Sequence, residues 1–489
     1  MLRRAIVSAA LFASVLAPGS AAAADTGLDR FYDQALDWKP CGTADLDDAG
    51  AQCADVTVPL DYADPQGRTI TVTISRLAAT DPARRRGIML SNPGGPGGPG
   101  LNMQLAFRPD YSPDVLAQYD LIGMDPRGVG RSTPITCRWP VAGLRSAGAD
   151  AADYAESVAT QADLAQRCRD TTGAALPYFN TRNTARDMDV IRAALGEQRI
   201  SYLGGSYGTY LGAVFIQMFP ERSDRMVLDS AVDPRRYGDA MLRDMGPANE
   251  SALDAWADWT AERDGEYRLG TDRGRVRAAV TTLIERAHRQ PIRIGAHQVD
   301  DEVLPALLFD LVANPKTYGV LAAHLRQLTD AADGLPVPPS PELDEALNGR
   351  LAGQPDDAQT WAIMCNDVPA PRDPLGYWNA IEASRSTLPV FGPFVHNIRP
   401  CAFWADPIET PTDVHNASPA LILQATGDPR TVYESGLALH RAMPGSRLIT
   451  VPDQRIHGVF GTVPCATAAT NTYLADGVLP ERDFTCETN

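Results

Sequence analysis

Short runs of apolar and β-branched residues alternate with turns along the first half of the chain. Residues 53–60 and 68–77 alternate apolar and polar positions on either side of Asp64-Pro65-Gln66-Gly67, which predicts an opening β-hairpin. Further short strands are predicted by a set of mostly apolar runs, at 87–91, 119–124, 199–203 and 225–230. Helical periodicity is expected between them, at 101–107, 141–195 and 209–219.

The pattern of apolar and polar positions changes in the second half of the chain. From residue 237 to residue 415 helical periodicity dominates, broken by proline-rich joints such as 335–339, and strand patterns return at 420–424 and 447–451. Alternating strands and helices around an insertion predict an α/β fold with a mostly parallel central sheet and a largely helical cap. We therefore expect four parts: a leader at 1–24, a first core part at 25–236, a cap at 237–415 and a second core part at 416–489.

The amino terminus is typical of a signal peptide. Arg3 and Arg4 precede an apolar stretch at 5–16 and a small-residue region at 21–24. The apolar stretch is short for a membrane span, and no later stretch is suitable, so we expect an exported, soluble mature protein without membrane insertion. An uncleaved anchor is the alternative.

All eight cysteines follow this leader, and an even number in an exported chain favours disulfides. The simplest scheme joins neighbours along the chain, Cys41–Cys53, Cys137–Cys168, Cys365–Cys401 and Cys465–Cys486, although sequence alone does not prove it. No Cys-x-x-Cys motif accompanies them, so no metal site and no cofactor are expected.

The formal charge of −17 becomes two units more negative when Arg3 and Arg4 leave with the leader. Such a charge disfavours nucleic acid and anionic membranes as partners. It favours a cationic ligand such as a peptide amino terminus, but a solvated acidic surface accounts for most of it. We expect a monomer that acts on a peptide or small-molecule substrate.

The segment Gly204-Gly205-Ser206-Tyr207-Gly208 lies between a predicted strand and a predicted helix. A Gly-x-Ser-x-Gly in this position is the nucleophile elbow, a turn so sharp that its neighbours must be glycine. Ser206 is therefore the candidate nucleophile. The pattern by itself also arises by chance in glycine-rich chains, and the strand–turn–helix context is what favours catalysis.

A glycine- and proline-rich stretch at 92–100 follows the strand at 87–91. It could be a linker, but glycine lets backbone N–H groups approach a developing oxyanion, so we favour a loop that stabilises this charge. The motif at 125–132, which contains Asp125, Arg127 and Arg131, is interpreted instead as a rigid turn with a buried Asp–Arg pair.

The two returning strands supply an acid and a base. Asp428 follows the apolar strand at 420–424, and His457 follows the strand at 447–451. The order Ser206, Asp428, His457 is the order of the triad in α/β-hydrolases. The other six histidines lie in helical or cap-like segments, and the rival acid Asp453 is only four residues before His457.

Taken together, these motifs resemble the secreted tripeptidyl aminopeptidase group of actinobacterial α/β-hydrolases, which is related to the prolyl aminopeptidases. The likeness covers nearly the whole chain after the leader and includes 92–98, 125–132, 204–212, Cys365-Asn366-Asp367, Asp428-Pro429-Arg430-Thr431 and His457-Gly458. The resemblance implies Ser206, Asp428 and His457 as the triad, and the backbone amides of Gly95 and Tyr207 as the oxyanion hole.

Relatives in the prolyl aminopeptidase group bind the substrate amine with carboxylates of the cap. By that resemblance Asp367, with Asp233 behind it, is the candidate amine anchor, and a structural role for either acid is the alternative. The chain departs from the usual pattern at Pro99 and at Arg430, which adds a charge near the expected site.

Three hypotheses follow for the activity. The first is an exported serine exopeptidase that releases short peptides, tripeptides above all, from free amino termini through an acyl-enzyme. The second is a serine esterase or amide hydrolase acting on small or lipid-like molecules, because the same triad cleaves esters. The third, a non-catalytic binding protein, is disfavoured because every triad member is present.

Overall fold

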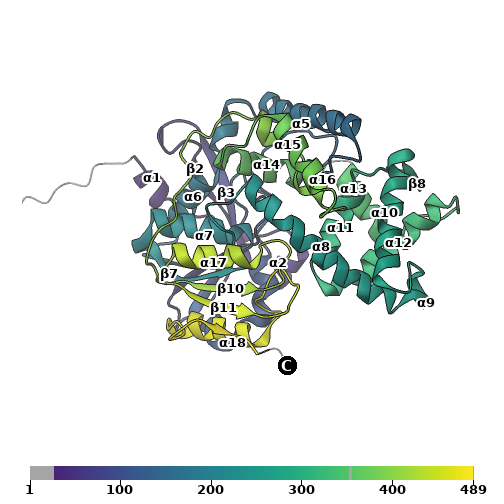
Figure 1. Cartoon of the computed structure of the whole chain (residues 1–489). Coiled ribbons are helices and arrows are strands. Elements are labelled where there is room, and N and C mark those ends of the chain that lie inside the picture. The colour runs from purple at the N-terminus through teal and green to yellow at the C-terminus, as the bar shows by residue number, and fades with distance from the viewer. Residues whose placement is uncertain (1–26, 352–354, 488–489) are drawn as a thin grey trace, which may run out of the picture.

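The structure is a computed structural model that describes residues 27–351 and 355–487 (Figure 1). The leader expected at residues 1–24 lies outside the described residues. None of the helices within the described ranges is long and apolar enough to cross a membrane.

Among the described residues, ten strands form one central sheet in the order β1-β2-β3-β5-β4-β6-β7-β10-β11-β12. The β1–β2, β2–β3 and β3–β5 pairs are antiparallel, and all pairs from β5–β4 to β11–β12 are parallel. The strands are β1 Lys39–Pro40, β2 Gln52–Pro59, β3 Thr69–Leu77, β4 Gly87–Asn92, β5 Tyr119–Met124, β6 Ile200–Gly205, β7 Ser223–Asp229, β10 Leu421–Ala425, β11 Arg447–Val451 and β12 Phe484–Thr485.

Helices cover both faces of the sheet because successive strand side chains point to opposite sides. Tyr202 joins the apolar core on one face and Leu203 the core on the other. The first core receives helices α6 Thr181–Ala194, α7 Tyr207–Met218 and α17 Tyr433–Ala442. The second receives α3 Met103–Phe107, α4 Pro113–Gln118 and α18 Pro464–Asp476. This arrangement is the predicted α/β-hydrolase fold.

The chain between β7 and β10 is mostly helical, as the periodicity predicted. Figure 1 shows α9 to α13 gathered beyond one side of the sheet, with α14, α15 and α16 above it. The elements are α8 Asp239–Ala261, α9 Asp264–Tyr267, α10 Arg273–Arg289, β8 Ile292–Ile294, β9 His297–Val299, α11 Leu304–Val312, α12 Tyr318–Ala332, α13 Pro341–Leu351, α14 Pro355–Asp367, α15 Pro374–Ser384 and α16 Gly392–Val395. The small β8–β9 hairpin was not predicted.

The remaining short elements complete the described chain. Helix α1 precedes the sheet, α2 lies between β1 and β2, and α5 precedes α6, while the 3-10 turns η1 to η5 join longer elements. Their bounds are α1 Asp29–Tyr32, α2 Ala44–Asp48, α5 Ala151–Thr172, η1 Arg108–Asp110, η2 Gly173–Tyr178, η3 Pro220–Arg222, η4 Pro315–Thr317 and η5 Pro400–Phe403.

Residues 141–150 are not helical, although helix was predicted from 141 onward. The backbone of this segment is bonded elsewhere: the amides of Ala142, Ser146 and Ala147 donate to carbonyls of the helical insertion. Helix begins only after Asp150, whose carboxylate and that of Asp153 form a reciprocal capping box. Long-range contacts therefore override local helix propensity here.

All four neighbour-to-neighbour disulfides are present, namely Cys41–Cys53, Cys137–Cys168, Cys365–Cys401 and Cys465–Cys486. Disulfides of this number are typical of proteins that fold in an oxidising compartment. The pairing predicted from sequence order is confirmed.

The expected buried Asp–Arg pair of the 125–132 turn exists, but its acid is a different residue. Arg127 is fully buried and forms a bidentate pair with Asp187 of α6, with N–O distances of 2.7 and 2.6 Å. Asp125 instead accepts hydrogen bonds from the backbone amides of Gly100, Leu101 and Arg131. Asp125 thus holds the end of the glycine-rich loop, which the motif alone did not indicate.

Candidate active site

Ser206 occupies the sharp turn between β6 and α7. Its φ of 56° and ψ of −124° are unusual for a residue with a side chain, as expected of a nucleophile elbow. A Cβ on Gly204 would lie 2.5 Å from the Gly208 carbonyl oxygen, and one on Gly208 would lie 2.5 Å from the Asn92 carbonyl oxygen. The glycines of the motif are therefore required by packing, and they leave Ser206 partly exposed.

The glycine-rich loop lies directly against this elbow. A Cβ on Gly94, whose φ is 105°, would come within 2.7 Å of the Gly205 carbonyl oxygen and 2.8 Å of Ser206 Cβ. Gly95 follows, and its amide donates to no other residue of the described chain. The Tyr207 amide lies in the first turn of α7, where helix geometry offers no acceptor. Two free N–H groups thus flank the nucleophile region.

Asp428 and His457 form a hydrogen-bonded pair. His457 Nδ1 lies 3.0 and 2.9 Å from the two carboxylate oxygens of Asp428, which is buried, whereas the His457 side chain is 24% exposed. Asp428 also accepts from the Arg430 amide at 2.8 Å and from the Thr431 hydroxyl at 2.9 Å. These donors fix the carboxylate so that it orients the imidazole. The rival acid Asp453 is exposed.

Two residues that the sequence analysis did not single out join His457 to the elbow. The Asp229 carboxylate accepts from the Val459 and Phe460 amides, and Ser230 Oγ accepts from the Gly458 amide at 2.9 Å. The Asp229 carbonyl in turn accepts from the Ser206 amide at 2.9 Å.

Burial raises the pKa of the Asp229 carboxyl, while these amides and nearby His457 oppose the rise. The end of β7 therefore fastens the histidine loop beside the nucleophile. In the sequence, the polar pair Asp229-Ser230 at the end of an apolar strand is the signal that could have indicated this attachment.

Arg430 points into the helical insertion. Its guanidinium lies 3.4 Å from the centre of the Phe309 ring and donates to Asn249 Oδ1 at 2.7 Å. Burial lowers the pKa of Arg430 to about 10. Asn249 Nδ2 donates back to the Pro429 carbonyl at 2.8 Å. Arg430, which we expected to add a charge near the site, therefore attaches the Asp428 loop to α8 and α11.

Asp367 is buried at the end of α14 and caps α6. Its carboxylate accepts from the Thr181 amide and hydroxyl, both at 2.6 Å, and from the Tyr237 hydroxyl at 3.2 Å. The Thr181 hydroxyl is also 2.6 Å from the hydroxyl of Tyr207, the residue after the nucleophile. Burial raises the pKa of Asp367 to about 7. Asp367 is thus linked to the elbow through two side chains.

Asp233 is partly exposed and lines a cavity of about 800 Å³ between α8 and α17. Its carboxylate accepts from the Arg235 amide at 2.9 Å. The same cavity is bordered by Asp428, whereas Ser206 and His457, both within the described ranges, are not among its lining residues. The volume is in the range of small-ligand sites.

The sequence of this chain is similar to those of several hydrolases. Residues 388–486 match a family described as "TAP-like protein". A tripeptidyl aminopeptidase of Streptomyces coelicolor is 35% identical over 477 residues, covering 92% of this chain and 86% of that protein. Carboxylesterase B of Mycobacterium tuberculosis is 32% identical, covering 89% and 86% of the two chains.

A serine protease, Hip1 of Mycobacterium tuberculosis, is 29% identical over 93% of this chain and 91% of its own. Among solved structures, a proline iminopeptidase from Mycobacterium smegmatis aligns with 13% identity and a TM-score of 0.36, covering 86% of this chain and 97% of that one. The 35% identity to tripeptidyl aminopeptidases extends over nearly the whole of this chain and most of the length of those proteins. The chain therefore belongs to the tripeptidyl aminopeptidase family of α/β-hydrolases.

Proposed function

We propose that this protein is an exported serine exopeptidase that releases short peptides, tripeptides above all, from free amino termini. The observation that carries the proposal is the Asp428–His457 pair, fastened through Asp229 to the strained elbow of Ser206. A nucleophile, an orienting acid and a base that follow β6, β10 and β11 of one parallel sheet are the parts that acyl transfer requires.

In the proposed reaction Ser206 Oγ attacks the carbonyl carbon of the scissile peptide bond while His457 Nε2 takes the hydroxyl proton. Asp428 accepts a hydrogen bond from Nδ1–H and stabilises the imidazolium. The developing oxyanion receives the N–H groups of Gly95 and Tyr207. His457 then protonates the leaving amine, and water attacks the acyl-enzyme to regenerate Ser206.

Asp367 and Asp233 are the proposed anchors for the free amine of the substrate. Asp367 is linked through the Thr181 hydroxyl to the hydroxyl of Tyr207, the residue after the nucleophile, and this link supports a position near the substrate. Asp233 is the more accessible of the two, since it lines an open cavity. A buried carboxylate that binds an ammonium gains more from the charge than an exposed one does.

The segment 237–415 is proposed to act as a cap that limits the length of the peptide accepted. Export through a leader at 1–24 agrees with the four disulfides. We further propose that the mature protein is a secreted monomer that binds peptides and neither binds nucleic acid nor inserts into membranes.

The test is hydrolysis of two chromogenic tripeptides that differ only in a free or an acetylated amino terminus. Matched dipeptide and tetrapeptide substrates measure the length preference, and Ser206→Ala is the inactive control. Cleavage of the free-amine tripeptide alone, lost in the variant, is the expected result. Equal cleavage of the acetylated peptide would contradict an amine anchor.

A second candidate is an esterase or amide hydrolase acting on small molecules. It is favoured by the 32% identity to a protein named carboxylesterase B. A short-chain p-nitrophenyl ester is therefore included in the same assay. Ester turnover without cleavage of either peptide would replace the first proposal by this one.

A further inference from the structure

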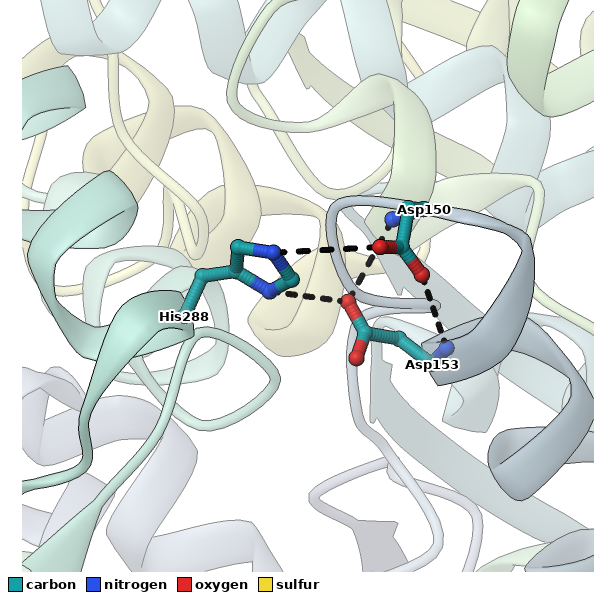
Figure 2. Close-up of side chains that lie close together, drawn as sticks. All are labelled: Asp150, Asp153 and His288. Atoms are coloured by element: carbon teal, nitrogen blue, oxygen red, sulfur yellow. Dashed lines mark hydrogen bonds and ion pairs between the residues drawn. The ribbon is translucent and has the colours of Figure 1, made fainter.

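Four side chains from three segments meet outside the candidate active site. Asp150 and Asp153 lie at the start of α5, His288 lies near the end of α10, and Asp301 precedes α11. Figure 2 shows the His288 ring facing the carboxylates of Asp150 and Asp153, with a different ring nitrogen directed at each. His288 Nδ1 is 3.0 Å from Asp153 Oδ2 and 3.5 Å from Asp301 Oδ2.

Asp301 is the observation that distinguishes this group from an ordinary surface ion pair. It is 6% exposed, and its Oδ2 has no hydrogen-bond donor among the described residues although it points toward His288. A buried carboxylate oxygen without a donor is uncommon in native proteins, because it loses its hydration without replacement.

The spacing of the donor atoms matches a small divalent ion. Zn²⁺ binds nitrogen and carboxylate oxygen at about 2.0–2.2 Å in tetrahedral sites, which places neighbouring ligand atoms roughly 3.3–3.5 Å apart. The 3.0 and 3.5 Å separations from His288 Nδ1 to Asp153 and Asp301 are close to this value. One ligand atom each of Asp150, Asp153 and His288 also lie within 4.8 Å of one another.

The two aspartates of α5 are already held in place by backbone donors. Asp153 Oδ2 accepts from the Ala149 amide at 2.8 Å, and Asp150 Oδ1 accepts from the Ala152 amide at 2.7 Å. Hydrogen bonds of this kind orient metal-binding carboxylates and reduce the cost of ordering them. Asp150 Oδ2 carries none of these bonds and lies 3.9 Å from His288 Nε2, on the side of the ring away from Nδ1.

The simpler alternative is that His288 is protonated and no metal binds, but this arrangement accounts less well for the positions of the three carboxylates. Its Nδ1 carries one proton, which cannot be directed at both Asp153 and Asp301. Three carboxylates around one imidazolium also leave an excess of negative charge, in a site that is partly buried.

We propose that Asp153, His288 and Asp301 bind a divalent transition-metal ion at His288 Nδ1, for which Zn²⁺ is the best match, with water as the fourth ligand. An imidazole nitrogen favours Zn²⁺ over Ca²⁺, which prefers oxygen ligands only. The ion would join α5 to α10 and to the start of α11. It would therefore stabilise the attachment of the helical insertion without taking part in the hydrolytic reaction.

The test uses the whole secreted protein after treatment with EDTA and removal of the chelator. Zn²⁺ alone is titrated by calorimetry, and the melting temperature is recorded with and without the ion. The variants are His288→Gln and Asp301→Asn. The control is His297→Gln, because His297 also pairs with a carboxylate, that of Asp344 at 2.8 Å, but faces no second one.

We expect one Zn²⁺ per chain and a raised melting temperature in the wild type and in the His297 variant. Affinity should fall by about tenfold or more in each of the other two variants, because each loses a ligand. Absence of stoichiometric binding in the wild type, or unchanged binding after His288→Gln, would overturn the proposal. An equal rise in melting temperature with Ca²⁺ would overturn the assignment of the ion.

Discussion

At the scale of single residues, the proposed chemistry depends on groups that the fold holds under strain or out of water. Ser206 is kept at positive φ by the hydrogen bond that its backbone N–H donates to the Asp229 carbonyl on one side and by the start of α7 on the other. Asp428 is buried and directed at His457 by three further donors. Both arrangements cost folding energy that the surrounding contacts must offset, which is typical of active sites.

Asp428→Asn should nearly abolish turnover without unfolding the protein. The amide would still fill the site, but it would favour the wrong tautomer of His457 and could not stabilise its cation. We expect kcat for the free-amine tripeptide to fall by about 10⁴-fold. Asp453→Asn is the matched control, because Asp453 lies in the loop that leads to His457 and is exposed. A similar loss in both variants would contradict the role of Asp428.

Asp367 makes the stability of the protein depend on pH. Its pKa of about 7 in the folded state lies above the value of about 3.9 for an unfolded aspartate. Between these values the folded state binds more protons, so the free energy of unfolding should decrease as pH rises, by at most about 1.4 kcal/mol per pH unit.

Asp367→Asn cannot ionise and should make this slope less steep, which urea unfolding from about pH 4 to about pH 7 would measure. Asp233→Asn, at a partly exposed site, should keep the slope of the wild type. An unchanged slope in the Asp367 variant would show that another group is responsible.

At the scale of elements, two loops must approach each other more closely than side chains allow. The loop after β4 and the elbow after β6 leave adjacent parallel strands, at the carboxyl edge where α/β sheets place their ligands. Asn92 contacts Gly208 and Gly94 contacts Gly205, so the two loops pack backbone against backbone. This close packing is what holds the loop of the proposed oxyanion hole beside Ser206.

Gly94→Ala should reduce turnover by more than the accompanying loss of folding stability explains. The added methyl group would displace the loop from Ser206, and loss of an oxyanion donor costs about 10²–10³-fold in kcat. Gly196→Ala is the control, since Gly196 also has positive φ, at 74°, but has open space around its Cβ position. We expect that control to lose stability and keep its kcat. Equal kcat in the two variants would contradict the role of the loop.

The hydrogen bonds between Asn249 of α8 and the loop that carries Asp428 allow a further test of how the site is supported. Asn249→Ala would leave Arg430 and the Pro429 carbonyl without a buried partner, at a cost of about 1–3 kcal/mol. We expect kcat to fall as well, because the Asp428 loop loses its support. Chemical denaturation and steady-state kinetics measure the two effects. Asn348→Ala, on an exposed side chain of α13, should change stability by less than about 0.5 kcal/mol.

At the scale of the whole molecule, local patterns predicted the sheet, the elbow and the disulfides, because their signals are contained in a few neighbouring residues. The partners of buried charges could not be predicted this way. Arg127 pairs with Asp187, and Asp367 caps a helix that begins 186 residues earlier. Arg430 is similar, since only the packed insertion reveals that it faces Phe309 rather than a substrate.

The four disulfides differ in loop length and in distance from the site, so their removal should have different effects. Cys365–Cys401 closes 36 residues, against 12 for Cys41–Cys53, and chain entropy makes the longer loop more stabilising by about 1 kcal/mol. Cys365 is also two residues from Asp367 in α14, whereas Cys53 lies in β2, near the edge of the sheet.

Replacing both cysteines of each pair by serine should therefore destabilise the protein in both cases, by about 2–5 kcal/mol. Only the 365–401 variant should also lose activity below its unfolding transition, because the end of α14 positions the Asp367–Thr181–Tyr207 chain. Thermal unfolding and tripeptide hydrolysis on the same samples separate the two effects. If the 41–53 variant lost activity to the same degree, reduced folding yield rather than the geometry of α14 would explain both results.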